Sequence, residues 1–95
     1  MVSAFPIRPT VGWAARVRKA IHTPAYRAFC AQLRERREAA GLTQAELAAT
    51  LHVTQSFVSS YEAGGRRLDL VELDQISAAL GTTLGEVVAE FNPRR

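Results

Sequence analysis

The sequence is poor in cysteine and in lysine, with one residue of each, Cys30 and Lys19. A single cysteine forms no internal disulfide and no multi-cysteine metal cage. The histidines, His22 and His52, have no recognised metal-ligand spacing with it, so we expect no metal site and no cofactor. No run approaches the ~18 apolar residues that a membrane span needs, and no segment alternates like a strand. Membrane proteins, zinc modules and β-rich folds are therefore excluded.

The 95 residues that are present have the composition of one ordinary globular domain, 47% hydrophobic and 22% charged. A chain of this length buries only a single modest core. Prolines and arginines interrupt the first twenty residues, so we expect no signal peptide and predict a cytoplasmic domain. With no nucleophile–base set and no phosphate-cradling glycine loop, the chain is not expected to be an enzyme.

Positive charge is concentrated at the start of the chain. Residues 1–22 hold four bases and no acid, a charge of +4, whereas residues 23–95 hold eight arginines and nine acids, a charge of −1. The four bases are Arg8, Arg16, Arg18 and Lys19. We divide the chain into a basic extension over 1–22, flexible or forming a short helix near 11–21, a domain over 23–92 and a tail over 93–95. A basic segment of this kind has two interpretations: a disordered extension, or an arm that follows the phosphates of a nucleic acid or enters its minor groove.

Capping signals predict five helices in the domain. Each predicted start has a side chain that accepts a hydrogen bond from the first helical turn, and Thr43 with Glu46 forms a capping box. The expected helices cover residues 24–40, 44–51, 55–63, 70–80 and 84–91. Apolar spacing places Val58 and Tyr61 of the third helix in the core and leaves Phe57 exposed. An apolar stripe on the fourth helix comprises Leu70, Leu73, Ile76 and Leu80.

The helices over 44–51 and 55–63 are short and separated by a three- to four-residue turn, which is the pattern of a helix-turn-helix. In such a motif the second helix projects side chains toward base edges in the major groove. Its projecting residues must then be polar or small. Here they are Gln55, Ser56, Ser59 and Ser60.

Between residues 29 and 91 the chain resembles the Xre family of helix-turn-helix regulators, which includes the Cro and phage repressor DNA-binding domains. The matching residues are Leu33, Arg37, the runs 40–48 and 53–62, Gly64, Arg67 and the run 80–82. The resemblance implies a five-helix, all-α, Cro-like fold that binds double-stranded DNA, in a protein that is bacterial and nucleoid-associated or phage-encoded. The sequence departs from the family at His52, where a glycine is usual because a left-handed backbone is often needed.

The resemblance also implies site roles that suit the residue chemistry. Gln55, Ser56, Ser59 and Ser60 would contact bases. Phosphates would be bound by Thr43, Gln44, Thr54, Arg66 and Arg67, helped by helix dipoles. Arg37 and Glu62 would form an internal ion pair.

Two functions remain open at this stage. The first is a sequence-specific transcriptional regulator, most simply a repressor, which binds a palindromic operator as a homodimer. Its dimer surface would be the last helix, which has more apolar residues than a small core needs: Leu84, Val87, Val88 and Phe91. The second is an antitoxin that binds a toxin, with the segment around Trp13 as the candidate surface, and represses its own operon through the same motif.

Overall fold

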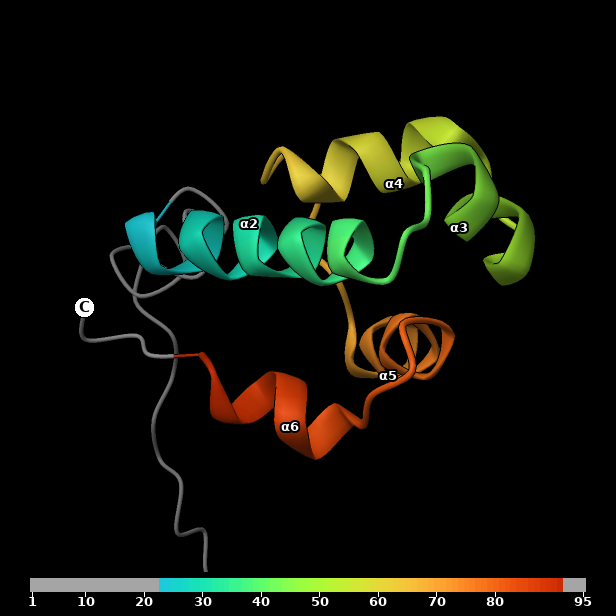
Figure 1. The fold of residues 1–95 in the computed structure, drawn as a ribbon. Helices are drawn as coiled ribbons and strands as arrows, with labels where there is room; N and C mark the ends of the chain where they lie inside the picture. Colours follow the sequence, from blue (N-terminus) through green and yellow to red (C-terminus); the bar gives the residue numbers. More distant parts are fainter. Residues whose placement is uncertain (1–22, 92–95) are drawn as a thin grey trace, which may run out of the picture.

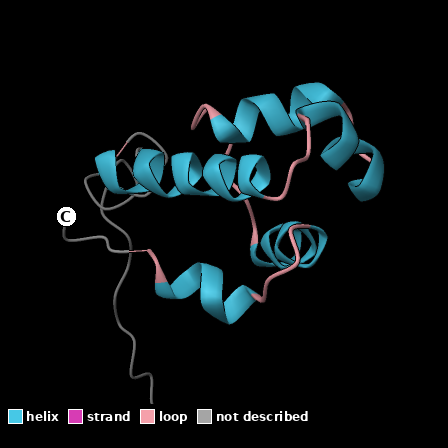
Figure 2. Cartoon of the chain, in the orientation of Figure 1, coloured by secondary structure: helices cyan, strands magenta, loops and turns pink. Residues whose placement is uncertain are grey.

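The computed structural model describes residues 23–91, and within this range it contains five helices and no strand (Figures 1 and 2). The helices are α2 (Pro24–Ala39), α3 (Gln44–Leu51), α4 (Gln55–Glu62), α5 (Leu70–Ala79) and α6 (Leu84–Ala89). The all-α prediction is confirmed. The predicted short helix near 11–21, the basic arm residues Arg8, Arg16, Arg18 and Lys19, and the tail over 93–95 lie outside the described residues.

Each helix begins at a side chain that caps it. Five side chains accept a hydrogen bond from the backbone N–H of the third residue of the helix that follows: Thr23, Thr43, Thr54, Asp69 and Thr83. The caps of α3, α5 and α6 are complete capping boxes, in which a glutamate returns a bond to the cap backbone. These local bonds explain why the helix starts were predictable from the sequence.

The long helix α2 lies in the middle of the molecule, with α4 along one side and α6 along the other (Figure 1). Helices α3 and α5 lie near its C-terminal end. Contacts join α3 to both α4 and α5, and α5 to α6. Helix α2 packs against α4 and helix α5 packs against α3, so both members of the helix-turn-helix pair are held by the rest of the domain.

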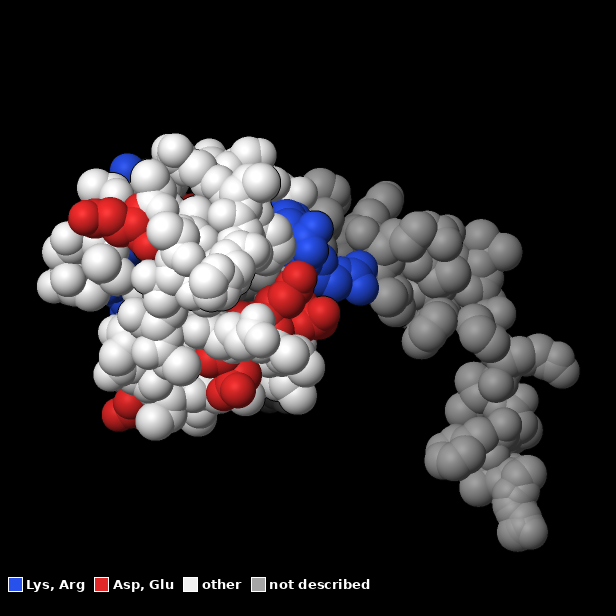
Figure 3. Space-filling view, turned by 90° about the vertical axis from the view of Figure 1, so that its right-hand side faces the viewer, with Lys and Arg blue, Asp and Glu red and all other residues white. Residues whose placement is uncertain are grey.

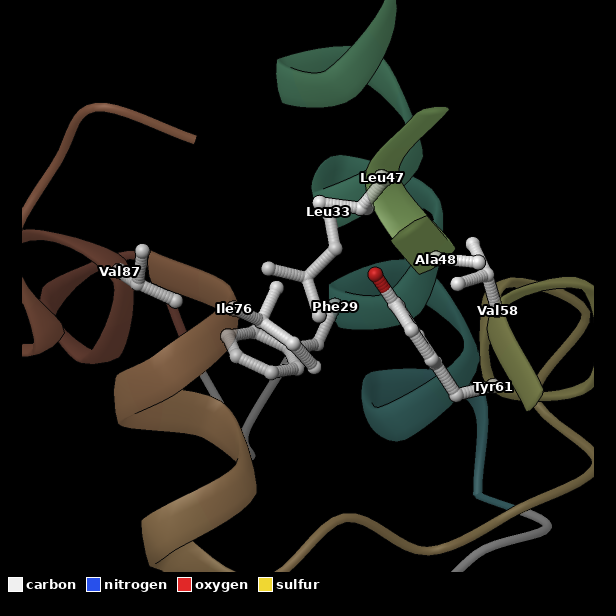
Figure 4. Close-up of a cluster of buried hydrophobic side chains, with 8 residues drawn as sticks. All are labelled: Phe29, Leu33, Leu47, Ala48, Val58, Tyr61, Ile76 and Val87. Atoms are coloured by element: carbon white, nitrogen blue, oxygen red, sulfur yellow. The ribbon is translucent and has the colours of Figure 1, made fainter. Parts of the chain in front are cut away.

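One cluster of apolar side chains fills the centre (Figure 4). Leu33 of α2, Leu47 of α3, Val58 and Tyr61 of α4, and Ile76 of α5 are each 1% exposed or less. Cys30 is also fully buried, as a packed thiol. Burying a side chain of this size contributes about 1.5–3 kcal/mol, so these contacts fix how α4 sits on the body.

Two expectations about apolar residues were wrong. Leu70 is 66% exposed and lies outside the core stripe of α5, which consists of later residues. Position 70 begins the helix, and the body of the domain does not extend over its first turn. Phe57, expected to be exposed, is half-buried and packs against the core cluster.

The last helix also ends earlier than predicted, at Ala89.

Candidate nucleic-acid interface

The turn between α3 and α4 has the tight geometry that a helix-turn-helix needs. His52 has φ 58° and ψ 42°, the left-handed conformation, and it is the sole non-glycine residue with positive φ in the described chain. The backbone N–H of Val53 donates to the Ala48 carbonyl at 3.0 Å, which closes the end of α3. Thr54 then caps α4 directly. The chain therefore reverses in three residues, with histidine occupying the position where glycine is usual.

Helix α4 has one buried face and one exposed face. Val58 and Tyr61 are fully buried. Three of the four predicted base-contacting residues, Gln55, Ser56 and Ser59, are exposed, and Ser60 is half-buried. The backbone carbonyl of Ser60 accepts a hydrogen bond from Gly65 at 2.9 Å, so this serine also shapes the end of the helix. The first half of α4 thus presents short polar side chains on a firmly packed helix.

The two threonines predicted to bind phosphate are helix caps. The Thr43 hydroxyl oxygen accepts from the Glu46 N–H at 3.0 Å, and that of Thr54 accepts from the Phe57 N–H at 3.2 Å. A hydroxyl that accepts one bond still has its own proton to donate. Both threonines are exposed, so each can cap its helix and donate to an anion at the helix N-terminus.

Arg37 and Glu62 form the ion pair expected from the sequence. Arg37 Nε and Nη2 donate to the two carboxylate oxygens at 2.7 and 3.0 Å, with both side chains at most 8% exposed. Nη1 also donates to the Leu42 carbonyl at 2.7 Å. The hydrogen bond to Glu62 raises the pKa of Arg37 above its ordinary value. This pair joins α2 to the C-terminal end of α4.

Gln44 belongs to the same network. Its amide Nε2 donates to Glu62 Oε1 at 3.0 Å, and the residue is half-buried. The sequence suggested a phosphate contact only. An amide nitrogen has two N–H groups, so one can hold Glu62 while the other faces outward. Gln44 thereby joins the start of α3 to the end of α4.

Arg66 and Arg67 follow α4 and are exposed. The Arg66 guanidinium lies over the Phe57 ring, 4.5 Å from its centroid, and Nη2 donates to Glu72 Oε2 at 2.8 Å. The sequence did not reveal these contacts, because Phe57 and Glu72 stand nine and six residues away with no helical register connecting them to Arg66.

Tyr26 is a further residue whose structural role the sequence did not reveal. Its hydroxyl donates to the Arg66 carbonyl at 2.6 Å and accepts from the Leu68 N–H at 3.1 Å. Burial is the main cause that raises the pKa of Tyr26 to about 12, so the hydroxyl stays protonated at neutral pH. This contact spans forty residues of sequence and fixes the loop that carries both arginines.

Charge on this domain is unevenly distributed. Residues 23–91 contain six arginines and nine acids, a charge of −3, and neither α3 nor α4 contains a lysine or arginine. Figure 3 shows one face with few charges, on which a basic cluster lies directly beside acidic side chains. The charge of −3 gives this body no broad positive field, so an anion bound to it would have to be held by individual donors.

Among residues 23–91, no three metal-ligating side chains gather into a possible ion site. Within the same range, no helix has both the length and the apolar character to cross a membrane.

Comparisons with known proteins agree with this geometry. The family model described as "Helix-turn-helix" matches residues 33–87. A curated relative, "Control protein C.MunI" of Mycoplasma sp, is 40% identical over 56 residues, covering 59% of this chain and 76% of that protein. A solved structure, an "XRE-family like protein" from Pseudomonas syringae pv. tomato str. DC3000, is 41% identical with a TM-score of 0.69, covering 80% of this chain and 93% of that one. The chain belongs to the helix-turn-helix family of DNA-binding regulators, of the XRE type.

Proposed function

We propose that this protein is a sequence-specific regulator that reads the major groove of double-stranded DNA with α4. The observation that carries the proposal is the division of α4 into a fully buried apolar face and an exposed polar face. A helix anchored by Val58 and Tyr61 presents Gln55 and Ser56 at its N-terminal end, which is the end that enters the groove in this motif.

The exposed side chains have the chemistry for base readout. A glutamine amide matches the N6 and N7 atoms of adenine in a bidentate contact, and serine hydroxyls pair with either donors or acceptors. Ser59 and Ser60 are short, so their contacts reach the bases through water. Around them, donors to phosphate would set the register of the helix: Thr43, Gln44, Thr54, Arg66 and Arg67.

Regulation follows from occupancy of the operator. A domain bound in the major groove at a promoter blocks access to that DNA, and repression is the simplest consequence. The names of the relatives, a control protein and an XRE-family-like protein, favour the regulator over the antitoxin interpretation.

We further propose that the protein binds as a homodimer through α6. Of the four apolar residues predicted for this surface, Val87 is instead fully buried in the core and Leu84 is half-buried. Val88 and Phe91 remain 45% and 40% exposed. They line a shallow apolar groove of about 190 Å³. A second copy related by two-fold symmetry would cover this face, and palindromic half-sites would then lie ~34 Å apart.

The direct test is a fluorescence-anisotropy titration of the DNA that precedes the gene, at two salt concentrations, with unrelated DNA for comparison. The variant Gln55→Ala/Ser56→Ala removes the proposed readout. Gln75→Ala is the matched control, because Gln75 is an exposed glutamine on α5.

If α4 reads the bases, the wild-type protein should bind the upstream DNA tightly and unrelated DNA weakly. The double variant should bind both kinds of DNA with similar affinity. Each lost base contact should cost about 1–3 kcal/mol, or roughly 5- to 150-fold in affinity. Equal, salt-steep binding of wild type and variant to every fragment would overturn readout by α4. A reporter fused to the bound promoter then gives the sign of regulation.

A further inference from the structure

The side chain of Arg66 is held away from its own loop. Its backbone follows the end of α4, yet its guanidinium lies over the ring of Phe57, the third residue of α4. The same ring packs edge-to-face on Tyr61, with centroids 5.8 Å apart, and joins the buried core. The position of the guanidinium is therefore fixed by a ring that cannot itself move without disturbing the core.

Two more contacts immobilise this arginine. Glu72 Oε2 accepts from Nη2 at 2.8 Å, while Glu72 Oε1 accepts from the Asp69 N–H in the cap of α5. The Tyr26 hydroxyl holds the Arg66 carbonyl at 2.6 Å. Backbone, guanidinium edge and guanidinium face are thus each fixed by a different partner.

The arrangement leaves donors for an anion. A guanidinium has five N–H groups in its plane, and stacking on a ring uses the face and not the edge. Glu72 takes one donor, and the Arg66 side chain is still 44% exposed. The remaining N–H groups lie beside the first turn of α4, where the backbone of DNA bound by this helix would pass.

Charge makes this position important. Arg66 and Arg67 are the sole basic residues between positions 41 and 91, and α3 and α4 contain none. A positive charge beside the N-terminal half of α4 must therefore come from another part of the chain, and the loop after α4 brings the Arg66 guanidinium there.

We propose that Phe57 is a positioning residue for DNA binding, which pre-organises Arg66 as a phosphate contact next to the recognition helix. The inference rests on the proposed function. Its physical basis is that an immobilised arginine loses less side-chain entropy when it binds, so a missing ring would weaken binding without removing any charge.

A double-mutant cycle on the full chain tests this role. Arg66→Gln should weaken operator binding and reduce the slope of log K against log salt by about 0.9, the value of one phosphate contact. Phe57→Leu, which keeps apolar packing, should weaken binding about two- to tenfold with Arg66 present. It should have almost no effect in the Arg66→Gln background, because the residue it positions is gone.

Conservative variants separate positioning from folding. Phe57→Tyr keeps the ring and should retain wild-type affinity. Arg66→Lys keeps the charge but not the planar face, so it should preserve the salt slope and still bind more weakly. This second variant tests the same contact even if Phe57→Leu fails to fold. Thermal melting of each variant, compared with its affinity, shows whether losses in binding follow losses in stability.

The possible outcomes are distinct. Equal effects of Phe57→Leu in both Arg66 backgrounds would overturn the positioning role, as would an Arg66→Gln variant with unchanged affinity and slope. If the wild type binds upstream DNA specifically, either result removes this inference alone. If the wild type shows no specific binding, the proposed function and this inference both fail.

Discussion

The hydroxyl of Tyr61 sits in the core without a hydrogen-bond partner among the described residues. The side chain is fully buried, and burial is the main cause that raises its pKa above the ordinary value of tyrosine, so the group stays protonated and uncharged. A buried donor left unpaired costs about 1–3 kcal/mol relative to one that is solvated or bonded. Tyr61 therefore combines a stabilising ring with a destabilising hydroxyl.

We predict that Tyr61→Phe raises the free energy of unfolding by about 1 kcal/mol, because it removes the unpaired hydroxyl and keeps the ring. The measurement is the urea midpoint at constant m-value. Tyr26→Phe is the matched control: its hydroxyl makes two hydrogen bonds, so the same change should lower stability. A Tyr61→Phe variant less stable than wild type would show that the hydroxyl does have a partner.

Single residues also show where sequence reasoning succeeds. The strain at His52 was predictable because the turn and its left-handed residue are encoded within four positions. The half-burial of Phe57 was not predictable, because its ring packs on the core cluster and is covered by Arg66 from the loop after α4. Gln44 was identified as a site residue, but its bond to Glu62 depends on tertiary packing.

At the level of secondary structure elements, α6 is the shortest helix and relies on its capping box. Glu86 accepts from the Thr82 hydroxyl at 2.6 Å and from the Thr83 N–H at 3.3 Å. The Thr82 bond is the main cause that lowers the pKa of Glu86 below its ordinary 4.5. Because the unfolded chain has the ordinary value, the stability from these bonds is fully present above about pH 4.5. It is lost as the pH falls through the lower folded value.

We predict that Thr82→Val raises the pKa of Glu86 toward 4.5, since it removes the strongest of these hydrogen bonds. An NMR titration of the Glu86 carboxylate measures this directly. Thr50→Val is the control, because the Thr50 hydroxyl donates to a backbone carbonyl in α3 and not to Glu86. An unchanged pKa in Thr82→Val would mean that the helix terminus, and not the hydroxyl, stabilises the charged form.

The elements themselves were largely predictable, and their faces less so. All five helix starts followed from caps, which are local signals. Leu70 was assigned to the core because spacing gives the face of a helix but not the extent of the body against which that face packs. The side chain of Leu70 is 66% exposed because of the position of α5 on the rest of the domain, which the sequence pattern of one helix does not determine.

On the scale of the whole molecule, the exposed apolar face of α6 predicts self-association. We expect Val88→Asp to convert a dimer to a monomer, because a buried unpaired carboxylate is costly at an interface. Val71→Asp is the matched control, since Val71 is an exposed valine of α5 outside this groove. Light scattering gives the mass of each. Dimers of both variants would place the interface elsewhere. Phe91 is unsuitable for this test, because its ring packs on Phe29 at 5.6 Å.

The distribution of charge gives the last prediction. The described domain has a charge of −3 from six arginines and nine acids, whereas residues 1–22 contribute +4. A domain with a net negative charge approaches DNA against repulsion unless another part of the chain supplies cations. If the four bases of the extension each neutralise a phosphate, binding should depend on salt far more steeply than the domain alone explains.

We therefore predict that replacing Arg8, Arg16, Arg18 and Lys19 with glutamine flattens the slope of log K against log salt by about 3.6, which is four contacts at about 0.9 each. The discrimination between operator and unrelated DNA should persist, because phosphate contacts carry no sequence information. The matched control replaces Arg34 with glutamine, since this arginine already pairs with Glu38 on the surface of α2. An unchanged slope would show that the four bases of the extension do not contact DNA phosphates.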